Sequence, residues 1–187
     1  SSVGTPLKSF EVKIDESTGE LLLKGPSIMK GYHNQPELTA QVIDKDGWFK
    51  TGDIAKIDKK GRIYITGRIK NLIVLSGGKK VFPEEVEAVM EQSELFEEAC
   101  VLGVSRDGGA KDGTEDVAVA ILPKQYLIEQ HSEEELESII RTEIKRLSQR
   151  LAAYKRPMNI NIVKEPMPRT KKATFQRNKV LEMIKKK

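Results

Sequence analysis

The hydrophobic pattern of the chain changes near residues 67–70, and this change limits the possible folds more than any other feature. Before it, short apolar runs alternate with polar residues and are separated by turn residues, as in antiparallel strands. After it, apolar residues at helical spacing alternate with strand-like runs. The 187 residues are enough for a small domain with an attached piece of another. We therefore predict an α+β chain with a boundary near this point.

The segment before this boundary predicts two β-hairpins. Each has two short strand-like runs on either side of a turn that contains Asp and Gly, the residue types that favour such turns. A loop over residues 25–48 joins the two hairpins. The expected strands are residues 10–14, 20–24, 54–57 and 62–66.

The segment after the boundary predicts a compact unit of helices and strands. Pro83 suits the first position of a helix, and the glutamates that follow favour its N-terminus. Ser132 and Glu135 have the spacing of a capping box, and apolar residues recur at helical spacing up to Leu151. A terminal helix is expected around Val180. The expected strands are residues 71–75, 100–104, 116–122 and 160–163, with a loop rich in Gly and Asp between the second and third.

Charged residues are unevenly distributed along a chain of net charge +4. Acidic clusters lie at residues 84–87 and 133–137, and basic residues gather from 164 to 187. The simplest interpretation is solvated helix faces and a basic, frayed end. Nucleic-acid binding is disfavoured because no aromatic residues interleave with the lysines as stacking platforms. A third interpretation is that the cations meet a polyanionic ligand such as a nucleotide or coenzyme.

Residue counts disfavour several other chemistries. The two histidines, His33 and His131, are far apart, so we predict no histidine-based metal site or catalytic triad. Cys100 is the single cysteine and lies in an apolar run, which predicts a buried thiol. No apolar run approaches the roughly 20 residues that span a bilayer, and the N-terminus lacks a signal-peptide pattern. We expect a cytoplasmic protein without a transmembrane segment, with peripheral membrane association as an alternative.

Loop glycines beside single charged residues are the best candidates for function. Asp53 follows Thr51 and Gly52 just ahead of an expected strand. Its carboxylate suits the vicinal hydroxyls of a ribose, although position alone favours an Asx-type turn. Arg68 suits a carboxylate, a phosphate or a ribose, or else a surface ion pair of small energy. No Walker-type phosphate loop occurs.

Four ordered motifs resemble those of the adenylate-forming acyl-CoA synthetases. They are GYHNQPELT at residues 31–39, DGWFKTGD at 46–53, GRIKNLI with SGG within 67–78, and FPEEVE at 82–87. The resemblance covers nearly the whole chain, and residues 151–157 and 168–170 are most similar to the long-chain fatty-acid branch. It implies a partial antiparallel β-barrel over residues 1–67, from the end of a large AMP-binding domain. Residues 68–187 would form the mobile α+β C-terminal domain.

The activity that this resemblance implies is that of an ATP-dependent fatty acid–CoA ligase. The acid attacks the α-phosphate of ATP to give an acyl-adenylate and pyrophosphate, and the coenzyme A thiol then displaces AMP. ATP, coenzyme A and Mg²⁺ carried by ATP are the implied cofactors. By this resemblance, the rest of the N-terminal large domain is expected to precede this chain, and the fragment alone is expected to be inactive. A ligase for another acid or for a carrier-protein thiol, and a non-catalytic binding module, are the alternatives.

By motif, the resemblance assigns roles to several residues. Asp53 and Arg68 would hold the adenylate ribose, and Lys70 would be the hinge between the domains. The coenzyme A path would run past Ser76, Gly77 and Gly78, because a narrow tunnel for pantetheine requires residues with little or no side chain. No residue is assigned to a metal.

The family's catalytic lysine is replaced here. Its position, six residues after Pro168, is occupied by Thr174. Threonine has no cation to offer the reacting carboxylate and α-phosphate. Three lysines lie nearby, and Lys172 is the substitute candidate among Lys171, Lys172 and Lys179. The sequence therefore leaves the catalytic residue unassigned.

Overall fold

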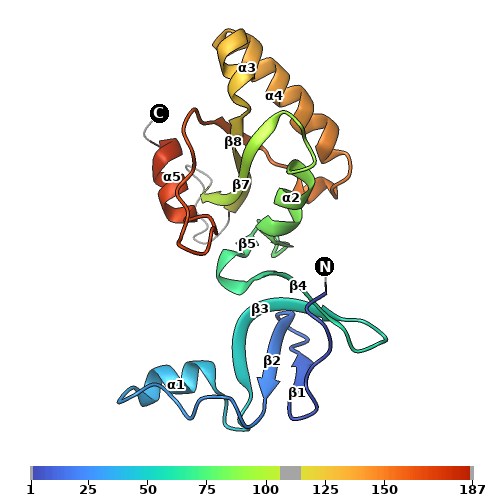
Figure 1. The fold of residues 1–187 in the computed structure, drawn as a ribbon, viewed down its shortest axis with the longest axis vertical. Coiled ribbons are helices and arrows are strands. Elements are labelled where there is room, and N and C mark those ends of the chain that lie inside the picture. Colours follow the sequence, from blue (N-terminus) through green and yellow to red (C-terminus); the bar gives the residue numbers. More distant parts are fainter. Residues whose placement is uncertain (1, 106–114, 186–187) are drawn as a thin grey trace. The chain divides into compact units, whose positions relative to one another are not determined.

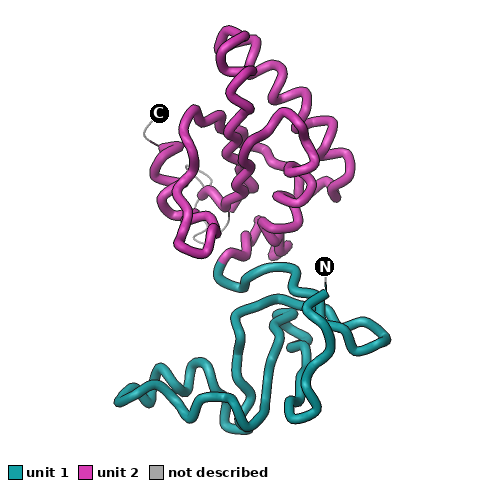
Figure 2. The backbone as a smooth tube through the Cα atoms, in the orientation of Figure 1, with its two compact units in different colours: residues 1–70 teal, residues 71–187 magenta. Residues whose placement is uncertain are grey.

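A computed structural model describes residues 2–105 and 115–185 of the protein. The expected loop rich in Gly and Asp falls largely on residues 106–114, outside the described residues. The chain divides into two compact units, residues 1–70 (unit 1) and 71–187 (unit 2), coloured separately in Figure 2. The division falls slightly after the boundary expected between residues 67 and 68, so Arg68 and Lys70 lie in unit 1. Both units contain helices and strands, and the expected α+β class is confirmed.

Unit 1 is a curled antiparallel sheet (Figure 1). Its four strands pair in chain order, and the two expected hairpins are confirmed. A small core of Leu21, Ala55 and Ile63 lies on one face of the sheet. The strands are β1 (Glu11–Ile14), β2 (Glu20–Lys24), β3 (Phe49–Ile57) and β4 (Ile63–Arg68).

A carboxylate organises the turn between β1 and β2. Asp15 Oδ1 accepts hydrogen bonds from the backbone N–H groups of Ser17 and Thr18, at 3.0 and 2.8 Å. The Ser17 and Thr18 hydroxyls donate to the same oxygen. These donors stabilise the ionised form, and the Ser17 hydroxyl is the strongest of them, so the pKa of Asp15 falls to about 2. The turn predicted between the first two strands is confirmed in this way.

Two details of unit 1 differ from the sequence prediction. Helix α1 (Pro36–Val42) lies within the expected loop over residues 25–48. It buries no residue, so it has no apolar stripe that a periodicity analysis could detect. Strand β3 begins at Phe49 rather than Ile54, which places Asp53 inside the strand and not ahead of it.

Unit 2 is a three-stranded sheet between helices. Strand β8 lies at its centre, antiparallel to β7 and parallel to β9. A separate small hairpin joins β5 to β6. The strands are β5 (Ile73–Val74), β6 (Lys80–Val81), β7 (Phe96–Ser105), β8 (Glu115–Pro123) and β9 (Asn159–Ile162). The helices are α2 (Pro83–Met90), α3 (Gln125–Gln130), α4 (Glu133–Ser148) and α5 (Arg177–Lys185), with the short 3₁₀ turn η2 (Ala153–Lys155). The 3₁₀ turn η1 (Ile69–Asn71) includes the division between the two units.

Alternate residues of the sheet in unit 2 enter two different cores. Val101 and Val119 pack with α2 and α4 in one core, whereas Cys100 and Ala118 pack with Val180 of α5 in the other. Figure 1 shows α5 (red) on the opposite side of β7 and β8 from α2 and α4. The sheet is therefore covered on both faces, and this explains why β8 is a continuous apolar run.

Several local predictions for unit 2 are confirmed. Helix α4 begins with the capping box of Ser132 and Glu135. The Ser132 backbone and hydroxyl donors lower the pKa of Glu135. Cys100 is a buried free thiol. The expected strand over residues 71–75 is shorter, since Asn71 ends η1 and only Ile73 and Val74 form β5. Within the described parts of the chain, no helix has the length and apolar character to cross a membrane.

Candidate functional site

Asp53 and Arg68 form an ion pair within unit 1. They face each other across β3 and β4, with 2.7 Å between Asp53 Oδ1 and Arg68 Nε. The side chains are 24% and 52% exposed, so the pair lies at the surface of the unit. Asp53 does not form the Asx-type turn that its position suggested, and its carboxylate instead pairs with Arg68, the second candidate residue.

The backbone before Asp53 is held in an irregular strand. Gly52 has a φ of 73°, a conformation that strongly favours glycine. The Gly52 N–H donates to the buried carboxylate of Glu20 at 2.7 Å, and the Thr51 hydroxyl donates to the Leu21 carbonyl. The pairing register between β3 and β4 shifts at Ile54. This bulge and its hydrogen bonds fix the direction of the Asp53 carboxylate.

The geometry of the pair suits the recognition of a diol. Arg68 engages one carboxylate oxygen of Asp53, and across the described residues the other oxygen, Oδ2, has no donor. A carboxylate with a free oxygen beside a guanidinium offers an acceptor and donors to neighbouring hydroxyls. Among the described residues there is no cluster of three His, Cys, Asp or Glu side chains that could hold a metal ion.

The Ser76-Gly77-Gly78 segment is the turn between β5 and β6 in unit 2. Leu75 donates to the Lys79 carbonyl at 2.9 Å and Gly78 to the Leu75 carbonyl at 3.0 Å. Gly77 and Gly78 have φ values of 85° and 76°, and a Cβ at either position would meet no atom of the described residues within 4 Å, apart from its chain neighbours. The conformation of the turn therefore explains both glycines, without a close approach by another described segment.

A basic and aromatic corner lies beside this turn. The Lys79 ammonium stands 4.9 Å from the centre of the Tyr154 ring, and Lys155 stands 5.7 Å from it. Lys155 also forms an ion pair with Glu85 of α2, and this hydrogen bond raises the pKa of Lys155. Tyr154 is 39% exposed, so one part of its ring stays accessible. Residues 151–157 contribute to the family resemblance, but no pattern in the sequence indicates this corner.

Thr174 lies in a short hairpin over residues 168–176. Thr170 donates from its backbone N–H to the Thr174 carbonyl at 2.8 Å, and the two hydroxyl oxygens lie 2.7 Å apart. Ala173 has a φ of 60°, a conformation that usually selects glycine. The Lys172 backbone N–H donates to the Thr170 hydroxyl. The hydroxyl of Thr174 is thus engaged inside the hairpin, and Lys171 and Lys172 occupy its exposed tip.

Lys70 is the last residue of unit 1. It lies in η1, is exposed, and is followed directly by the division between the two units. This location is that of a connecting residue. Its role as a hinge stays a prediction.

The expectation of a solvated acidic face on α2 is wrong for Glu87. Glu87 is 8% exposed, and both of its oxygens lie within 2.8 Å of Arg177 Nη2. It also accepts from the Val101 N–H at 2.8 Å, while Arg177 Nε donates to the Val101 carbonyl. Burial raises the pKa of Glu87, and the nearby Arg177 opposes this shift. The pair joins α2, β7 and α5, elements far apart in the sequence, so no local pattern could reveal it.

Comparison with known proteins assigns the chain to a family. A family model described as "AMP-binding enzyme C-terminal domain" matches residues 70–187. The 2-succinylbenzoate–CoA ligase of Listeria monocytogenes serotype 4b is 40% identical over 182 residues, which are 97% of this chain and 35% of that protein. The long-chain-fatty-acid–CoA ligase of Bacillus subtilis is 36% identical over 97% of this chain and 31% of its own length. The chain therefore spans about a third of the relatives that it matches.

Solved structures agree with the sequence relatives. ATP-bound MatB from Rhodopseudomonas palustris has a TM-score of 0.78 and 29% identity, over 97% of this chain and 35% of that one. The O-succinylbenzoate coenzyme A synthetase of Bacillus subtilis, in complex with ATP and magnesium, has a TM-score of 0.73 and 29% identity, over 96% and 35%. Because the family model matches residues 70–187 and a relative is 40% identical over 97% of the chain, the chain belongs to the AMP-binding enzyme family and contains its C-terminal domain.

Proposed function

We propose that the full-length protein is an ATP-dependent acid–thiol ligase that forms an acyl-adenylate and transfers the acyl group to coenzyme A. The observation that carries this proposal is the Asp53–Arg68 pair, because both residues named by the ribose-binding resemblance meet at 2.7 Å. A free carboxylate oxygen beside a guanidinium suits the 2′- and 3′-hydroxyls of an adenylate. Mg²⁺ would enter with ATP rather than occupy a site on this chain.

The coenzyme A path is proposed to run past Ser76, Gly77 and Gly78. These residues are exposed, and a path beside them would end at Tyr154 and the Lys79 ammonium. An exposed aromatic ring suits an adenine base, and a free ammonium suits the phosphates of a nucleotide. The corner therefore matches the chemistry of a coenzyme that carries both groups.

The acid is proposed to be a carboxylic acid of the kinds used by the relatives. A long-chain fatty acid fits the resemblance of residues 151–157 and 168–170, and one relative bears that name. Several others are named for 2-succinylbenzoate. The choice between these acids is left to the experiment.

A second candidate is a protein that has lost adenylation. The observation that favours it is the hydroxyl of Thr174, which contacts Thr170 and offers no cation. Lys172 lies two residues away at the tip of the same hairpin and is our proposed substitute. A protein without a substitute cation would bind coenzyme A, or complete only the thioester half-reaction.

The experiment is product analysis with the full-length protein. It is incubated with ATP, Mg²⁺, coenzyme A and single acids, including long-chain fatty acids and 2-succinylbenzoate, and the products are identified by mass spectrometry. The proposal predicts an acyl-CoA and equimolar AMP with at least one acid. Coenzyme A binding without AMP formation from any acid would favour the non-catalytic candidate.

A further inference from the structure

The hairpin over residues 168–176 is tied to the sheet of unit 2 by one carboxylate. Glu98 on β7 accepts the Met167 N–H with Oε2 at 2.8 Å and Arg169 Nε with Oε1 at 2.9 Å. Its side chain is only 14% exposed. Both oxygens of Glu98 are thus used to hold the first strand of the hairpin against β7.

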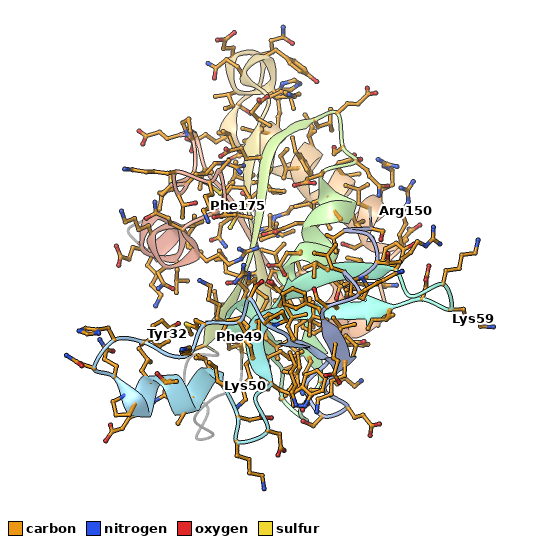
Figure 3. All side chains as sticks on the ribbon, turned by 60° about the horizontal axis from the view of Figure 1, so that its bottom comes forward. Tyr32, Phe49, Lys50, Lys59, Arg150 and Phe175 are labelled. Atoms are coloured by element: carbon orange, nitrogen blue, oxygen red, sulfur yellow. The ribbon has the colours of Figure 1, made fainter. Side chains whose placement is uncertain are left out.

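Arg169 connects Glu98 to the second strand of the hairpin. Its Nη1 donates to the Ala173 carbonyl at 2.7 Å, and its guanidinium lies 3.8 Å from the centre of the Phe175 ring. Phe175 is labelled in Figure 3. The Arg169 carbonyl accepts from Gln176 Nε2 at 2.6 Å. A single side chain therefore contacts residues on both sides of Thr174.

The backbone of the hairpin needs this support. Ala173 adopts a φ of 60°, which is unfavourable for any residue with a Cβ. Such a conformation persists when surrounding contacts determine it. The Arg169 bond to the Ala173 carbonyl acts at this residue, and Thr174 follows directly.

We infer that Glu98 and Arg169 are a positioning pair for adenylation, holding the hairpin so that position 174 and the lysines at its tip meet the reacting phosphate. This inference rests on the proposed function. The contacts of the pair are with the hairpin and β7, so the proposed role is to position other residues. It acts by fixing the backbone that carries the reacting side chains, where an error of about 1 Å costs about 100-fold in rate.

The two half-reactions provide the test, because the α-phosphate reacts only in the first. In the full-length protein, adenylation is measured by acid-dependent ATP–pyrophosphate exchange. Thioester formation is measured separately, from a supplied acyl-adenylate and coenzyme A. Glu98→Gln and Arg169→Lys are compared with the wild type, and again in a Thr174→Lys background. Arg169→Lys keeps the positive charge. A lysine ammonium cannot donate to both Glu98 and the Ala173 carbonyl and also stack on the Phe175 ring, as the planar guanidinium does.

The expected result is a fall in the kcat of exchange by about 10- to 100-fold in both variants. Thioester formation and the melting temperature should stay near those of the parent. Arg141→Ala is the matched control, because Arg141 forms an exposed ion pair with Glu137 on α4 and should leave both half-reactions unchanged. If wild-type exchange is absent, the comparison is made in the Thr174→Lys background.

An independent readout is the order of the hairpin itself. Glu98→Gln retains every lysine and arginine, so trypsin cleavage after Lys171 or Lys172 reports the opening of the tip. We expect this cleavage to become faster in Glu98→Gln than in the wild type or Arg141→Ala.

Two results would overturn the inference while leaving the proposed function intact. One is wild-type rates of exchange and cleavage in both variants. The other is a parallel loss of both half-reactions together with a lower melting temperature, which would make the pair purely structural. Absence of both half-reactions with every acid, in the wild type and in the Thr174→Lys background, would instead overturn the proposed function and the inference with it.

Discussion

Asp53 Oδ1 and Arg68 Nε lie 2.7 Å apart, on directly opposed residues of neighbouring strands. About half of the Arg68 side chain is exposed, so solvent screens the pair. A structural role would require the pair to stabilise unit 1, whereas a binding role would not. Stability and activity measurements on the same substitutions can therefore separate the two roles.

Loss of this pair should hardly affect stability. We predict that Asp53→Ala, Arg68→Ala and the double variant each change the free energy of unfolding by less than about 1 kcal/mol, as for other exposed ion pairs. Urea denaturation of the 187-residue chain measures this change, and the double-mutant cycle isolates the pairwise energy. A coupling energy well above this value would make the pair a structural element.

Removal of Arg177 should have a much larger effect. Its guanidinium pairs with the buried carboxylate of Glu87, and Arg177→Met leaves that carboxylate without its cation. We predict a loss of about 3–5 kcal/mol from the free energy of unfolding of unit 2. Arg146→Met is the control, because Arg146 pairs with Glu143 at the surface and is 55% exposed. Equal losses in the two variants would contradict the account.

The loss of unfolding free energy in Arg177→Met should also depend on pH. Burial already raises the pKa of Glu87 in the folded state. Loss of the cation raises this pKa further. Protonated Glu87 then favours the folded state, and this contribution to the free energy of unfolding is lost as the pH rises through the pKa of the folded state. Denaturation at pH 4 and pH 7 should therefore show a smaller defect at pH 4, relative to wild type. A defect that grows on acidification would have the wrong sign.

The thiol of Cys100 should be unreactive toward thiol reagents in the folded protein. Burial, with the nearby Glu87 charge as a smaller contribution, raises the pKa of its thiol to about 12. The thiolate is the reactive form, so little of it exists at neutral pH. We predict no labelling by a thiol reagent such as iodoacetamide until urea unfolds unit 2. Fast labelling of the native chain would contradict the packing of α5 over β7.

Tyr154 should contribute to coenzyme A binding and not to adenylation. Base stacking on an aromatic ring is worth about 1–3 kcal/mol, which predicts an increase in the KM for coenzyme A of about 5- to 150-fold in Tyr154→Ala of the full-length protein. Acid-dependent pyrophosphate exchange should not change. Tyr126→Ala is the control, because Tyr126 is a similarly exposed tyrosine on α3. A KM that is equal in the two variants would remove Tyr154 from the coenzyme path.

Elements with strong local signals could be predicted from the sequence. The cap of α4 depends on two residues three positions apart, and the hairpin of β1 and β2 on one Asp-containing turn, so both were predicted correctly. Helix α1 was missed because it buries nothing. Strand β3 begins earlier than predicted because Phe49 and Lys50 pair with β2, in a stretch that shows no clear alternation of burial.

Contacts between distant segments could not be predicted. Glu87 and Arg177 are ninety residues apart, and each alone is typical of a solvated helix. Glu98 and Arg169 are also far apart and meet only because β7 lies beside the last hairpin. Asp53 and Arg68 are the exception, because each lies in one of the motifs that carry the family resemblance. The register of β3 and β4 places the two residues opposite each other.

The most direct test of the account is acid-dependent ATP–pyrophosphate exchange by the full-length protein carrying Asp53→Ala. Asp58→Ala is the matched control, because Asp58 also pairs with an arginine, Arg62, at 2.7 Å in unit 1. If Asp53 binds the adenylate ribose, two charge-assisted hydrogen bonds are lost and exchange should fall by about 100-fold. Asp58→Ala should keep the rate of the wild type. Equal exchange in the two variants would contradict the assignment of Asp53 and Arg68 to the nucleotide.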